Sequence, residues 1–374
     1  MHHPSLAFTL LAFALLLGPL VLLHELGHYL MARLFDIKAD VFSVGFGKEL
    51  IGRTDKRGTR WKLSMLPLGG YVQFAGDANA ASMPDRSLSE ARQGWALAEK
   101  ADTFHIRPLW QRALVVAAGP IMNFLIAIAI FTAFNLAYGR LEAPPVVAGF
   151  VGGSPAAEAG IKPGDRIVAL NGTAITRFEQ IRPLVAPYPG QQARITVVRG
   201  GKPLDFRVTI ATREERDSFG NVSRMGLLGI AGSGFQVVRV GPLEAVGLAC
   251  RQTWDIVYMS VVGLGQVITG ERSTSELGGP IKIAQYSGQQ LAMGWLNFVD
   301  FVALISINLA FINLLPIPGL DGGHLAFYLA EAVRRRPMAV RGQEWALRTG
   351  IALVLALIVF VTVNDLASLH LFGG

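Results

Sequence analysis

Four long apolar stretches are separated by polar segments along the chain. They cover residues 6–23, 113–138, 301–320 and 345–363, and only the last contains a charge, Arg348 near its start. A helix needs roughly 20 apolar residues to cross a bilayer, so each stretch is close to or above that length. The first is not typical of a cleaved signal peptide, because no basic segment precedes it and no small-residue cleavage pattern follows it. The pattern predicts a polytopic α-helical membrane protein with about four transmembrane helices.

The composition supports this prediction. Of the 374 residues, 51% are hydrophobic and only 16% are charged, and the mean hydropathy is +0.41. This apolar excess excludes a wholly soluble protein, and the low charge argues against disorder. The net charge of +7 does not predict a nucleic-acid partner, because the sequence has no basic stripe interleaved with aromatic residues. Cys250 is the single cysteine, which excludes an intrachain disulfide and a cysteine zinc cluster.

Lysine and arginine are concentrated in two polar segments, residues 36–112 and residues 325–344. Basic residues next to membrane helices remain mainly on the cytoplasmic side. Both segments are therefore predicted to be cytoplasmic. The long segment of residues 140–300 and both chain ends are then expected on the opposite side of the membrane.

Residues 143–212 have the pattern of a small separate domain, with short alternating strands between glycine and proline turns. The run SPAA at residues 154–157 opens a short helix, and GIKPGD at residues 160–165 makes a turn. These motifs resemble a PDZ domain in its circularly permuted bacterial arrangement. PDZ domains bind extended peptide ends by adding a strand to a sheet edge, so the resemblance implies peptide recognition; a passive spacer is the alternative. Residues 224–230 are interpreted as the remnant of a second such unit.

The sequence His-Glu-Leu-Gly-His at residues 24–28 follows directly after the first apolar stretch. Histidines at positions i and i+4 share one helix face, and the glutamate beside them reaches a water at the same metal, so this spacing is typical of zinc hydrolases. Polar side chains at the end of a membrane helix are also costly unless they are paired or bind a metal. We therefore predict that His24 and His28 bind a metal ion.

A catalytic zinc site usually has three protein ligands, so a further ligand is expected. The extended motif HExxHxxGxxH is excluded, because Met31 and Leu34 stand at the required positions. Glu49 is a weak alternative: it follows the motif as a gluzincin ligand would, but the residues before it are typical of a strand and turn rather than a second helix.

Asp321 is the favoured third ligand. It follows the third apolar stretch, where an unpaired carboxylate is costly, and Pro316 and Pro318 prevent a regular helix before it. His324 stands close by in the sequence, but it is interpreted as a capping or pairing residue. Asp321 and the two histidines would all lie near the cytoplasmic face if the first and third helices both run inward.

Residues 248–268 decide whether that geometry is possible. If this segment crossed the membrane, the third helix would run outward and Asp321 would lie roughly 25–30 Å from the histidines. Arg251 and Asp255 stand at i and i+4 in its first turns, which favours an amphipathic helix on the outer membrane surface. We therefore predict an interfacial helix, with an embedded helix as the alternative.

Three motifs stand in a fixed order along the chain: HELGH at residues 24–28, GPIMN at residues 119–123 and NLLPIPGLDG at residues 313–322. With them the chain resembles the site-2 protease family of intramembrane zinc metalloproteases over nearly its whole length. The resemblance implies a Zn2+ cofactor, with His24, His28 and Asp321 as ligands and Glu25 as the catalytic acid and base. Gly119 and Asn123 are interpreted as residues that permit close helix packing.

The resemblance also implies the substrates and the location. The expected substrates are transmembrane segments of single-span proteins, such as an anti-sigma factor that restrains an envelope-stress sigma factor, and remnant signal peptides. A helical substrate must unwind before its carbonyls can react, and a re-entrant β-hairpin at residues 61–74 is predicted to receive it. The resemblance gives Asn313, with Pro316 and Pro318, a substrate-binding role; a helix-packing hydrogen bond is the alternative for Asn313. The expected location is a bacterial inner membrane.

The predicted fold class is a polytopic α-helical membrane protein with a re-entrant β-hairpin and one periplasmic PDZ-like α/β domain. A non-catalytic zinc scaffold that captures peptides is the main alternative function, and a transporter is a weaker one because no inverted repeat is visible. The predicted segments are helix 1 with HELGH at 1–35, a cytoplasmic loop with the hairpin at 36–112, helix 2 at 113–138, the PDZ domain at 143–212, a periplasmic linker with the interfacial helix at 213–297, helix 3 at 298–324, a cytoplasmic loop at 325–344 and helix 4 at 345–365.

Overall fold

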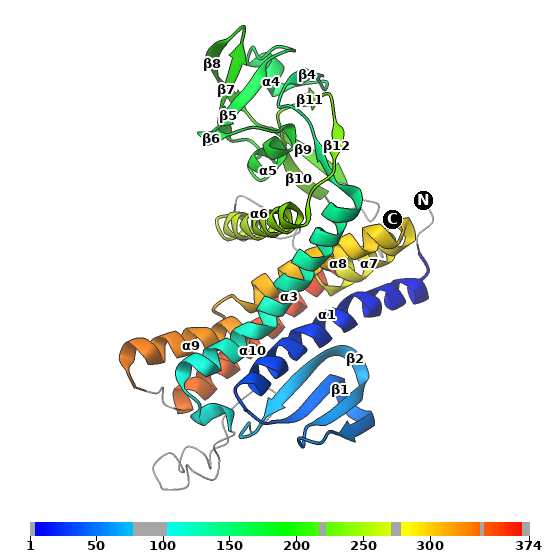
Figure 1. The fold of residues 1–374 in the computed structure, drawn as a ribbon, viewed down its shortest axis with the longest axis vertical. Coiled ribbons are helices and arrows are strands. Elements are labelled where there is room, and N and C mark those ends of the chain that lie inside the picture. The colour runs from blue at the N-terminus through cyan, green and yellow to red at the C-terminus, as the bar shows by residue number, and fades with distance from the viewer. Residues whose placement is uncertain (1–3, 78–102, 217–221, 271–277, 337–339, 369–374) are drawn as a thin grey trace. The chain divides into compact units, whose positions relative to one another are not determined.

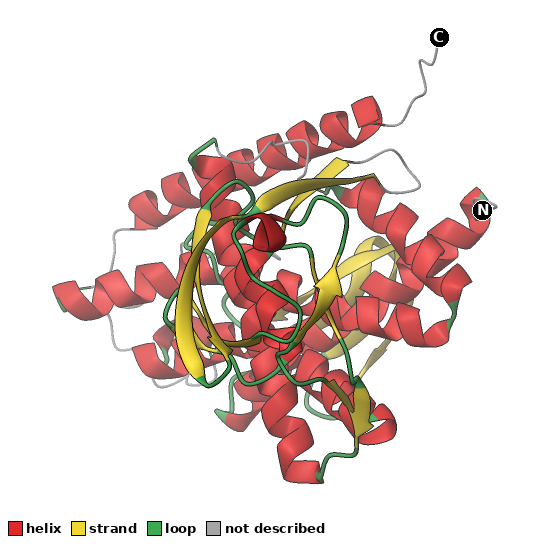
Figure 2. Cartoon of the chain, turned by 90° about the horizontal axis from the view of Figure 1, so that it is seen from above, coloured by secondary structure: helices red, strands yellow, loops and turns green. Residues whose placement is uncertain are grey.

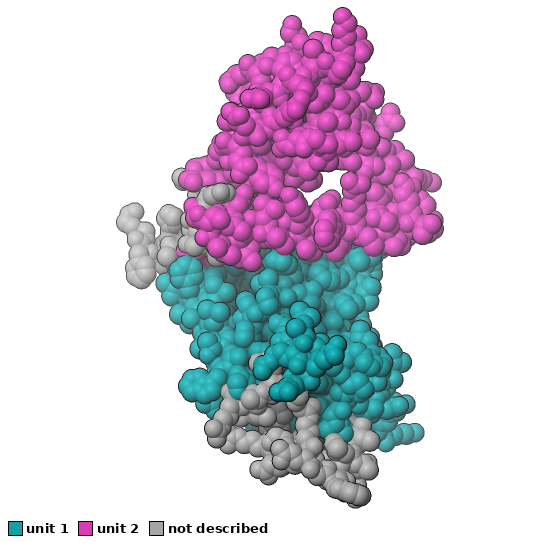
Figure 3. Space-filling model, turned by 90° about the vertical axis from the view of Figure 1, so that its left-hand side faces the viewer, with its two compact units in different colours: residues 1–130, 278–363 teal, residues 131–277, 364–374 magenta. Residues whose placement is uncertain are grey.

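The chain forms two compact units (Figure 3). In the computed structural model, unit 1 comprises residues 1–130 and 278–363, and unit 2 comprises residues 131–277 and 364–374. The structure describes residues 4–77, 103–216, 222–270, 278–336 and 340–368. Residues 78–102, part of the predicted cytoplasmic segment, lie outside the described residues.

Four helices among the described residues are long and apolar enough to cross a membrane (Figures 1 and 2). They are α1 (Leu6–Leu34), α3 (Leu109–Tyr138), α8 (Trp295–Asn313) and, within α10 (Val340–Ser368), the segment Trp345–Leu366. The expected number of candidate membrane helices is therefore confirmed by length and composition.

Helix α1 carries the first motif on its buried face. It begins after Ser5, whose side chain accepts a hydrogen bond from the Phe8 N–H as an N-cap. Residues four apart lie on the same side of a helix, and one buried stripe follows this spacing: Ala12, Leu16, Leu20, His24 and His28. The two histidines thus continue an apolar packing surface into the protein interior.

The N-terminal part of this stripe packs against α7 (Pro280–Met293) and α8, where Ala12, Leu16 and Phe298 form a buried cluster. Helix α7 corrects the prediction that residues 213–297 contain a linker and a single helix. Its small residues permit close contact, because a Cβ added to Gly288 would lie 2.8 Å from the Thr9 hydroxyl. A segment with modest hydropathy is therefore helical because it packs against α1.

Strands β1 (Ala39–Thr54) and β2 (Arg60–Phe74) are antiparallel and lie beside α1 (Figure 1). Register shifts bend both strands along their length, and Gly45 and Gly47, with φ of 89° and 90°, stand where β1 changes its pairing. Glycine adopts this left-handed backbone without the Cβ penalty of other residues. The strands are longer than the hairpin that the sequence predicts.

The bent strands form four short segments. Residues 39–44 pair with residues 70–74 on one side and with residues 60–63 on the other, and residues 49–54 pair with residues 60–64. Their order is 70–74, 39–44, 60–64 and 49–54. Residues 70–74 therefore pair with residues 39–44 on one side only. Their other side is a sheet edge, and no further strand among the described residues pairs with it.

The segment between α8 and α9 (Asp321–Arg334) is not helical, as Pro316 and Pro318 predict. The predicted bounds are wrong on both sides of it: α8 ends at Asn313, so Asp321 begins a new helix, and that helix occupies part of the predicted loop at 325–344. Helix α9 forms there because its side chains Leu325 and Tyr328 pack into the core around the end of α1.

Unit 2 contains a four-stranded sheet and several short strand pairs. The sheet has the order β6 (Thr173–Ala174), β5 (Arg166–Leu170), β7 (Gln192–Arg199) and β8 (Lys202–Thr209). Short helices α4 (Pro155–Glu158) and α5 (Ile181–Val185) belong to the same unit. The pairs are β3 (Arg140–Glu142) with β12 (Gln236–Val238), β4 (Val147–Phe150) with β11 (Ile230–Gly232), and β9 (Ala211–Arg216) with β10 (Val222–Leu227).

The segment after residue 212 belongs to this unit and is not the remnant of a second domain. Strand β11 pairs with β4, and Leu228 lies in the hydrophobic core formed by the four-stranded sheet and α4. The Leu228 carbonyl accepts hydrogen bonds from the Ser154 hydroxyl and the Ala156 N–H. The predicted domain boundary at residue 212 is therefore too early, because β4 needs β11 to satisfy its backbone.

Helix α6 (Pro242–Ile268) packs within unit 2. The Tyr188 and Tyr258 hydroxyls are 2.8 Å apart, and the Gln266 side chain donates a hydrogen bond to the Pro187 carbonyl. Helix α6 is not among the candidate membrane spans of the described residues. Whether α6 lies on the membrane surface or crosses the membrane stays a prediction.

A buried ion pair should control the stability of unit 2. Asp165 is 1% exposed, and Arg199 donates to both of its carboxylate oxygens at 2.7 Å. These hydrogen bonds lower the pKa of Asp165. We expect Asp165→Asn to destabilise the unit by about 2 kcal/mol, measured by hydrogen exchange of residues 147–209 in the full chain. The contribution of the pair should be fully present at neutral pH and fall as acid protonates Asp165, below about pH 4.

The control is Asp205→Asn on the same sheet, because Asp205 pairs with Arg194 while both side chains are largely exposed. Exposed pairs contribute about 0–1 kcal/mol. An equal effect of the two substitutions would show that burial of Asp165 does not determine the stability of the unit.

Candidate metal centre

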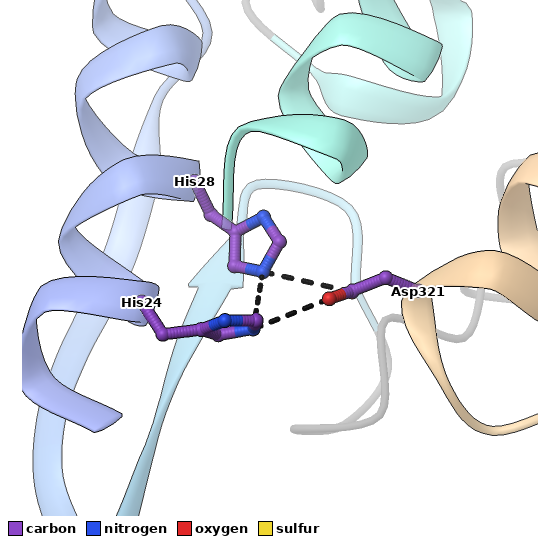
Figure 4. A group of neighbouring side chains, drawn as sticks. All are labelled: His24, His28 and Asp321. Atoms are coloured by element: carbon purple, nitrogen blue, oxygen red, sulfur yellow. Dashed lines mark hydrogen bonds and ion pairs between the residues drawn. The ribbon is translucent and has the colours of Figure 1, made fainter. Parts of the chain in front are cut away.

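Three predicted residues meet at one point in unit 1 (Figure 4). The Nε2 atoms of His24 and His28 are 3.2 Å apart. One carboxylate oxygen of Asp321 lies 3.2 Å from His24 Nε2, and the other lies 3.6 Å from His28 Nε2. Among the described residues, these three form the one group of histidine, cysteine and acidic side chains that is close enough to share a metal ion.

The spacing of the donor atoms, two imidazole nitrogens and the two oxygens of one carboxylate, fits zinc. Nitrogen and oxygen ligands lie about 2.0–2.2 Å from a tetrahedral zinc ion, so neighbouring ligand atoms are about 3.3–3.6 Å apart. The observed separations of 3.2–3.6 Å agree with that value. Two imidazoles and one carboxylate are also a donor set that catalytic zinc sites use, with a further position left for water or substrate.

The far side of each imidazole ring is held by α3. His28 Nδ1 lies 2.9 Å from the Val115 carbonyl, which can only accept a hydrogen bond. Nδ1 therefore carries the proton and Nε2 presents its lone pair to the centre. His24 Nδ1 lies 3.2 Å from the side-chain amide of Asn123.

Gly119 makes room for both rings. A Cβ added to Gly119 would lie 2.3 Å from His28 Nε2 and 2.8 Å from His24 Nε2. Helix α3 approaches α1 equally closely at Gly27, where a Cβ would lie 2.4 Å from the Ala118 carbonyl oxygen. Glycine is therefore required at both positions by the close approach of two helices and not by an unusual backbone conformation.

Asp321 reaches the histidines because α9 starts at this position. The segment before it is not helical and folds back over the first turn of α9. A Cβ on Gly322 would lie 2.3 Å from the Leu314 carbonyl oxygen, and one on Gly323 would lie 2.3 Å from the Ile317 carbonyl oxygen. The amino end of a helix also favours a negative charge. Backbone close packing and the helix terminus thus place the carboxylate.

A cavity of about 310 Å³ opens at this centre within unit 1. Glu25 lines it, next to both histidines on α1. The sheet edge of β2 forms another wall, and a Cβ on Gly70 would lie 3.3 Å from Glu25 Cγ. His24, His28 and Asp321 also line the cavity. The β2 edge contributes Tyr71 and Val72 beside Gly70, and the other lining residues include Phe104, Asn313, Leu320 and His324.

The remaining predicted residues differ in their positions. Asn313 lines the cavity, whereas Pro316 and Pro318 are not among the residues that line it and lie in the broken segment before Asp321. Glu49, the alternative ligand, instead receives two hydrogen bonds from the Arg60 guanidinium on the β1–β2 sheet. The geometry therefore favours Asp321 over Glu49.

Three residues, Gly119, Asn123 and His324, lie closer to the centre than the sequence predicts. The sequence predicts Gly119 and Asn123 only as packing residues, whereas Gly119 lies against both histidine rings and Asn123 contacts His24. Their spacing of four, on a helix beside the motif, is the signal that could have revealed this role. His324, interpreted as a capping residue, lines the cavity, and burial lowers its pKa, which favours the neutral ring.

Comparison with known proteins identifies the family. Residues 12–357 match the family model of peptidase family M50. A proposed zinc metalloprotease of Agrobacterium fabrum is 45% identical over 361 residues, which cover 96% of this chain and 95% of that protein. Another from Rhizobium meliloti is 43% identical, covering 97% of each chain. Metalloprotease MmpA of Caulobacter vibrioides is 35% identical, covering 97% of this chain and 96% of that protein.

The chain therefore belongs to peptidase family M50, the site-2 protease family, and it is a zinc metalloprotease. The predicted resemblance and the predicted zinc cofactor are confirmed. A non-catalytic zinc scaffold, the main alternative from the sequence, is disfavoured by this membership.

Gly119→Ala should reduce zinc binding. The added methyl group would occupy space within 2.8 Å of both Nε2 atoms, so at least one ring must move away from the centre. We expect zinc affinity to fall about tenfold or more, as for other changes that displace ligands, measured by chelator competition and metal analysis of the purified protein. Gly18→Ala on α1 is the control, because a Cβ there meets nothing within 4 Å. Equal zinc affinity in both variants would contradict this account of Gly119.

Proposed function

We propose that this member of peptidase family M50 is an intramembrane endopeptidase that cleaves transmembrane segments of single-span proteins. The observation that carries the proposal is the position of the three converging side chains. His24 and His28 belong to α1, which is long and apolar enough to cross a membrane, and Asp321 follows α8, which is also a candidate span. A centre built on such helices is suited to substrates that are themselves in the membrane.

In this proposal His24, His28 and Asp321 hold the zinc ion. Zinc supplies a Lewis acid, which polarises a peptide carbonyl and makes water a stronger nucleophile at neutral pH. Their separations of 3.2–3.6 Å support the assignment. The imidazoles must be neutral and the carboxylate ionised to act as ligands, and the Val115 carbonyl keeps the His28 lone pair directed at the centre.

Glu25 is the proposed acid and base. It stands beside His24 on α1 and lines the same cavity, so its carboxylate can take a proton from the attacking water. It then delivers that proton to the amine that leaves when the peptide bond breaks. One group serves both steps because the proton it gains in the first is the one it donates in the second.

The sheet edge at residues 70–74 is the proposed binding site for an unwound substrate. Peptide carbonyls in a helix are already hydrogen-bonded, so cleavage requires an extended segment with new partners. This edge has no pairing strand among the described residues, and Gly70, Tyr71 and Val72 line the cavity. An extended segment could add to the edge as a further strand beside Glu25. The sheet would then act as the predicted re-entrant hairpin.

Asn313 is the second proposed substrate contact. It ends α8, lines the cavity and carries an amide that can donate to and accept from an extended backbone. Pro316 and Pro318 support this role indirectly by keeping the chain non-helical before Asp321. They are proposed to shape the site rather than to face the cavity.

Unit 2 is proposed to be a PDZ-like domain that binds peptide ends and controls entry. Its four-stranded sheet, the short helices α4 and α5 and the turn at Asp165 support this interpretation. We place the unit on the periplasmic face of a bacterial inner membrane and the active site near the cytoplasmic face, because basic residues cluster in the polar segments after α1 and around α9. Membrane lipids then surround unit 1.

The proposed physiological substrates are an anti-sigma factor, whose cleavage would release an envelope-stress sigma factor, and remnant signal peptides. The family resemblance supports this choice. Both are single apolar segments, which can enter laterally and extend along a sheet edge once their helix has opened.

Glu25→Gln should remove activity without removing zinc. The amide keeps the size of the side chain but cannot accept and return a proton, so we expect cleavage of a transmembrane substrate in detergent to fall by about 10²–10⁴-fold. Zinc content should stay at the wild-type level. Glu49→Gln is the control, because Glu49 pairs with Arg60 on the sheet. Undiminished cleavage by Glu25→Gln would refute the proposed role.

The proposed topology can be tested by cysteine labelling. Cys250 lies near the start of α6 and is exposed, and a second cysteine in place of Gln266 would lie near its end. If α6 lies on the outer membrane surface, a membrane-impermeant reagent should label both positions from the periplasmic side of intact cells. Labelling of the two positions from opposite sides would show that α6 crosses the membrane.

A further inference from the structure

Asn123 lies at the back of the metal centre, on the side of His24 away from Asp321. Its side chain is fully buried, with 0% exposure. The amide nitrogen lies 3.2 Å from His24 Nδ1, and the amide oxygen has no hydrogen-bond partner. A buried polar atom without a hydrogen-bond partner is unusual in a folded protein. It points to another orientation of the amide, in which the oxygen accepts a hydrogen bond.

The two orientations of the amide have opposite consequences for His24. If the Asn123 nitrogen donates to Nδ1, the proton of a neutral ring must be on Nε2, the atom that faces His28 and Asp321. A half-turn about the Cβ–Cγ bond brings the oxygen to Nδ1 instead. The oxygen then accepts from the Nδ1–H, and Nε2 has a free lone pair. A metal ion can bind only the second form.

A hydrogen bond from α8 holds the backbone at Asn123. The Ser306 hydroxyl on α8 donates to the Asn123 carbonyl at 2.8 Å, and Ser306 is also fully buried. On α3, Val115, Gly119 and Asn123 follow at intervals of four and share one face. The first accepts from His28, the second leaves room for both rings and the third faces His24.

We propose that Asn123 is a positioning residue that accepts a hydrogen bond from His24 Nδ1–H through its side-chain oxygen, and so directs His24 Nε2 to the zinc ion. The inference rests on the proposed function in one respect, the assignment of His24 as a zinc ligand. Each ligand histidine then has its own acceptor on α3: a backbone carbonyl for His28 and a side-chain amide for His24. Of these two acceptors, mutation can remove only the Asn123 side-chain amide.

Substitution of Asn123 by leucine and by aspartate separates this role from packing. Leucine has a similar volume but no acceptor, so zinc affinity measured by chelator competition should fall about 10–100-fold. Aspartate keeps the acceptor and loses the donor, so its affinity should stay within about threefold of wild type. Asn135→Leu is the matched control on the same helix, because Asn135 is also buried but contacts Gln252. Its zinc affinity should equal that of the wild type.

Three outcomes would overturn the inference. They are a wild-type zinc affinity in Asn123→Leu, an equal loss in the leucine and aspartate variants, and an equal loss in Asn135→Leu. If Asn123→Leu does not fold, as judged by thermal unfolding, Asn123→Ala is measured in its place with the same expected loss. His24→Ala, measured in parallel, tests the proposed function separately. Zinc loss in His24→Ala with full affinity in Asn123→Leu rejects the inference alone, and retention in His24→Ala rejects the ligand assignment.

Discussion

Two imidazoles and one carboxylate lie within 3.2–3.6 Å of one another in the interior of a membrane-type helix assembly, and most of unit 1 follows from keeping them there. Such groups are costly in an apolar interior unless a metal or hydrogen bonds satisfy them. The three side chains come from opposite ends of the sequence, so their convergence requires that α1, α3 and the start of α9 pack closely. With these residues as the proposed zinc ligands, zinc binding and the packing of unit 1 are coupled.

The close packing is achieved by backbone rather than by large side chains. Gly27 and Gly119 bring α1 and α3 together, and Gly322 and Gly323 let the proline-containing segment fold against α9. The same arrangement leaves the sheet edge at residues 70–74 as one wall of the cavity. The proposed cleavage of an unwound helix would need both features, because bound zinc would polarise the carbonyl and the edge would replace the lost backbone hydrogen bonds.

Much of this site could be predicted from the sequence because its signals are local. The spacing of four places His24 and His28 on one helix face. Each of the two prolines before Asp321 lacks a backbone N–H, which predicts a non-helical segment there. The roles of Gly119 and Asn123 depend on which face of α3 meets α1. Their spacing of four places them on one face of α3 but does not show that this face meets α1. Likewise, the long apolar stretches predict α1 and α3, whereas α7 and α9 are stabilised by packing, and β11 completes unit 2 through a long-range pairing with β4.

X-ray absorption at the zinc K-edge of the purified protein tests the central claim most directly. The account predicts two imidazole nitrogens and at least one carboxylate oxygen at about 2.0–2.2 Å, with no sulfur. It also predicts that the carboxylate contribution disappears in Asp321→Asn, while Glu49→Gln leaves the spectrum unchanged. A sulfur ligand at about 2.3 Å, which only Cys250 or a methionine could supply, or a spectrum that Asp321→Asn does not change, would contradict it.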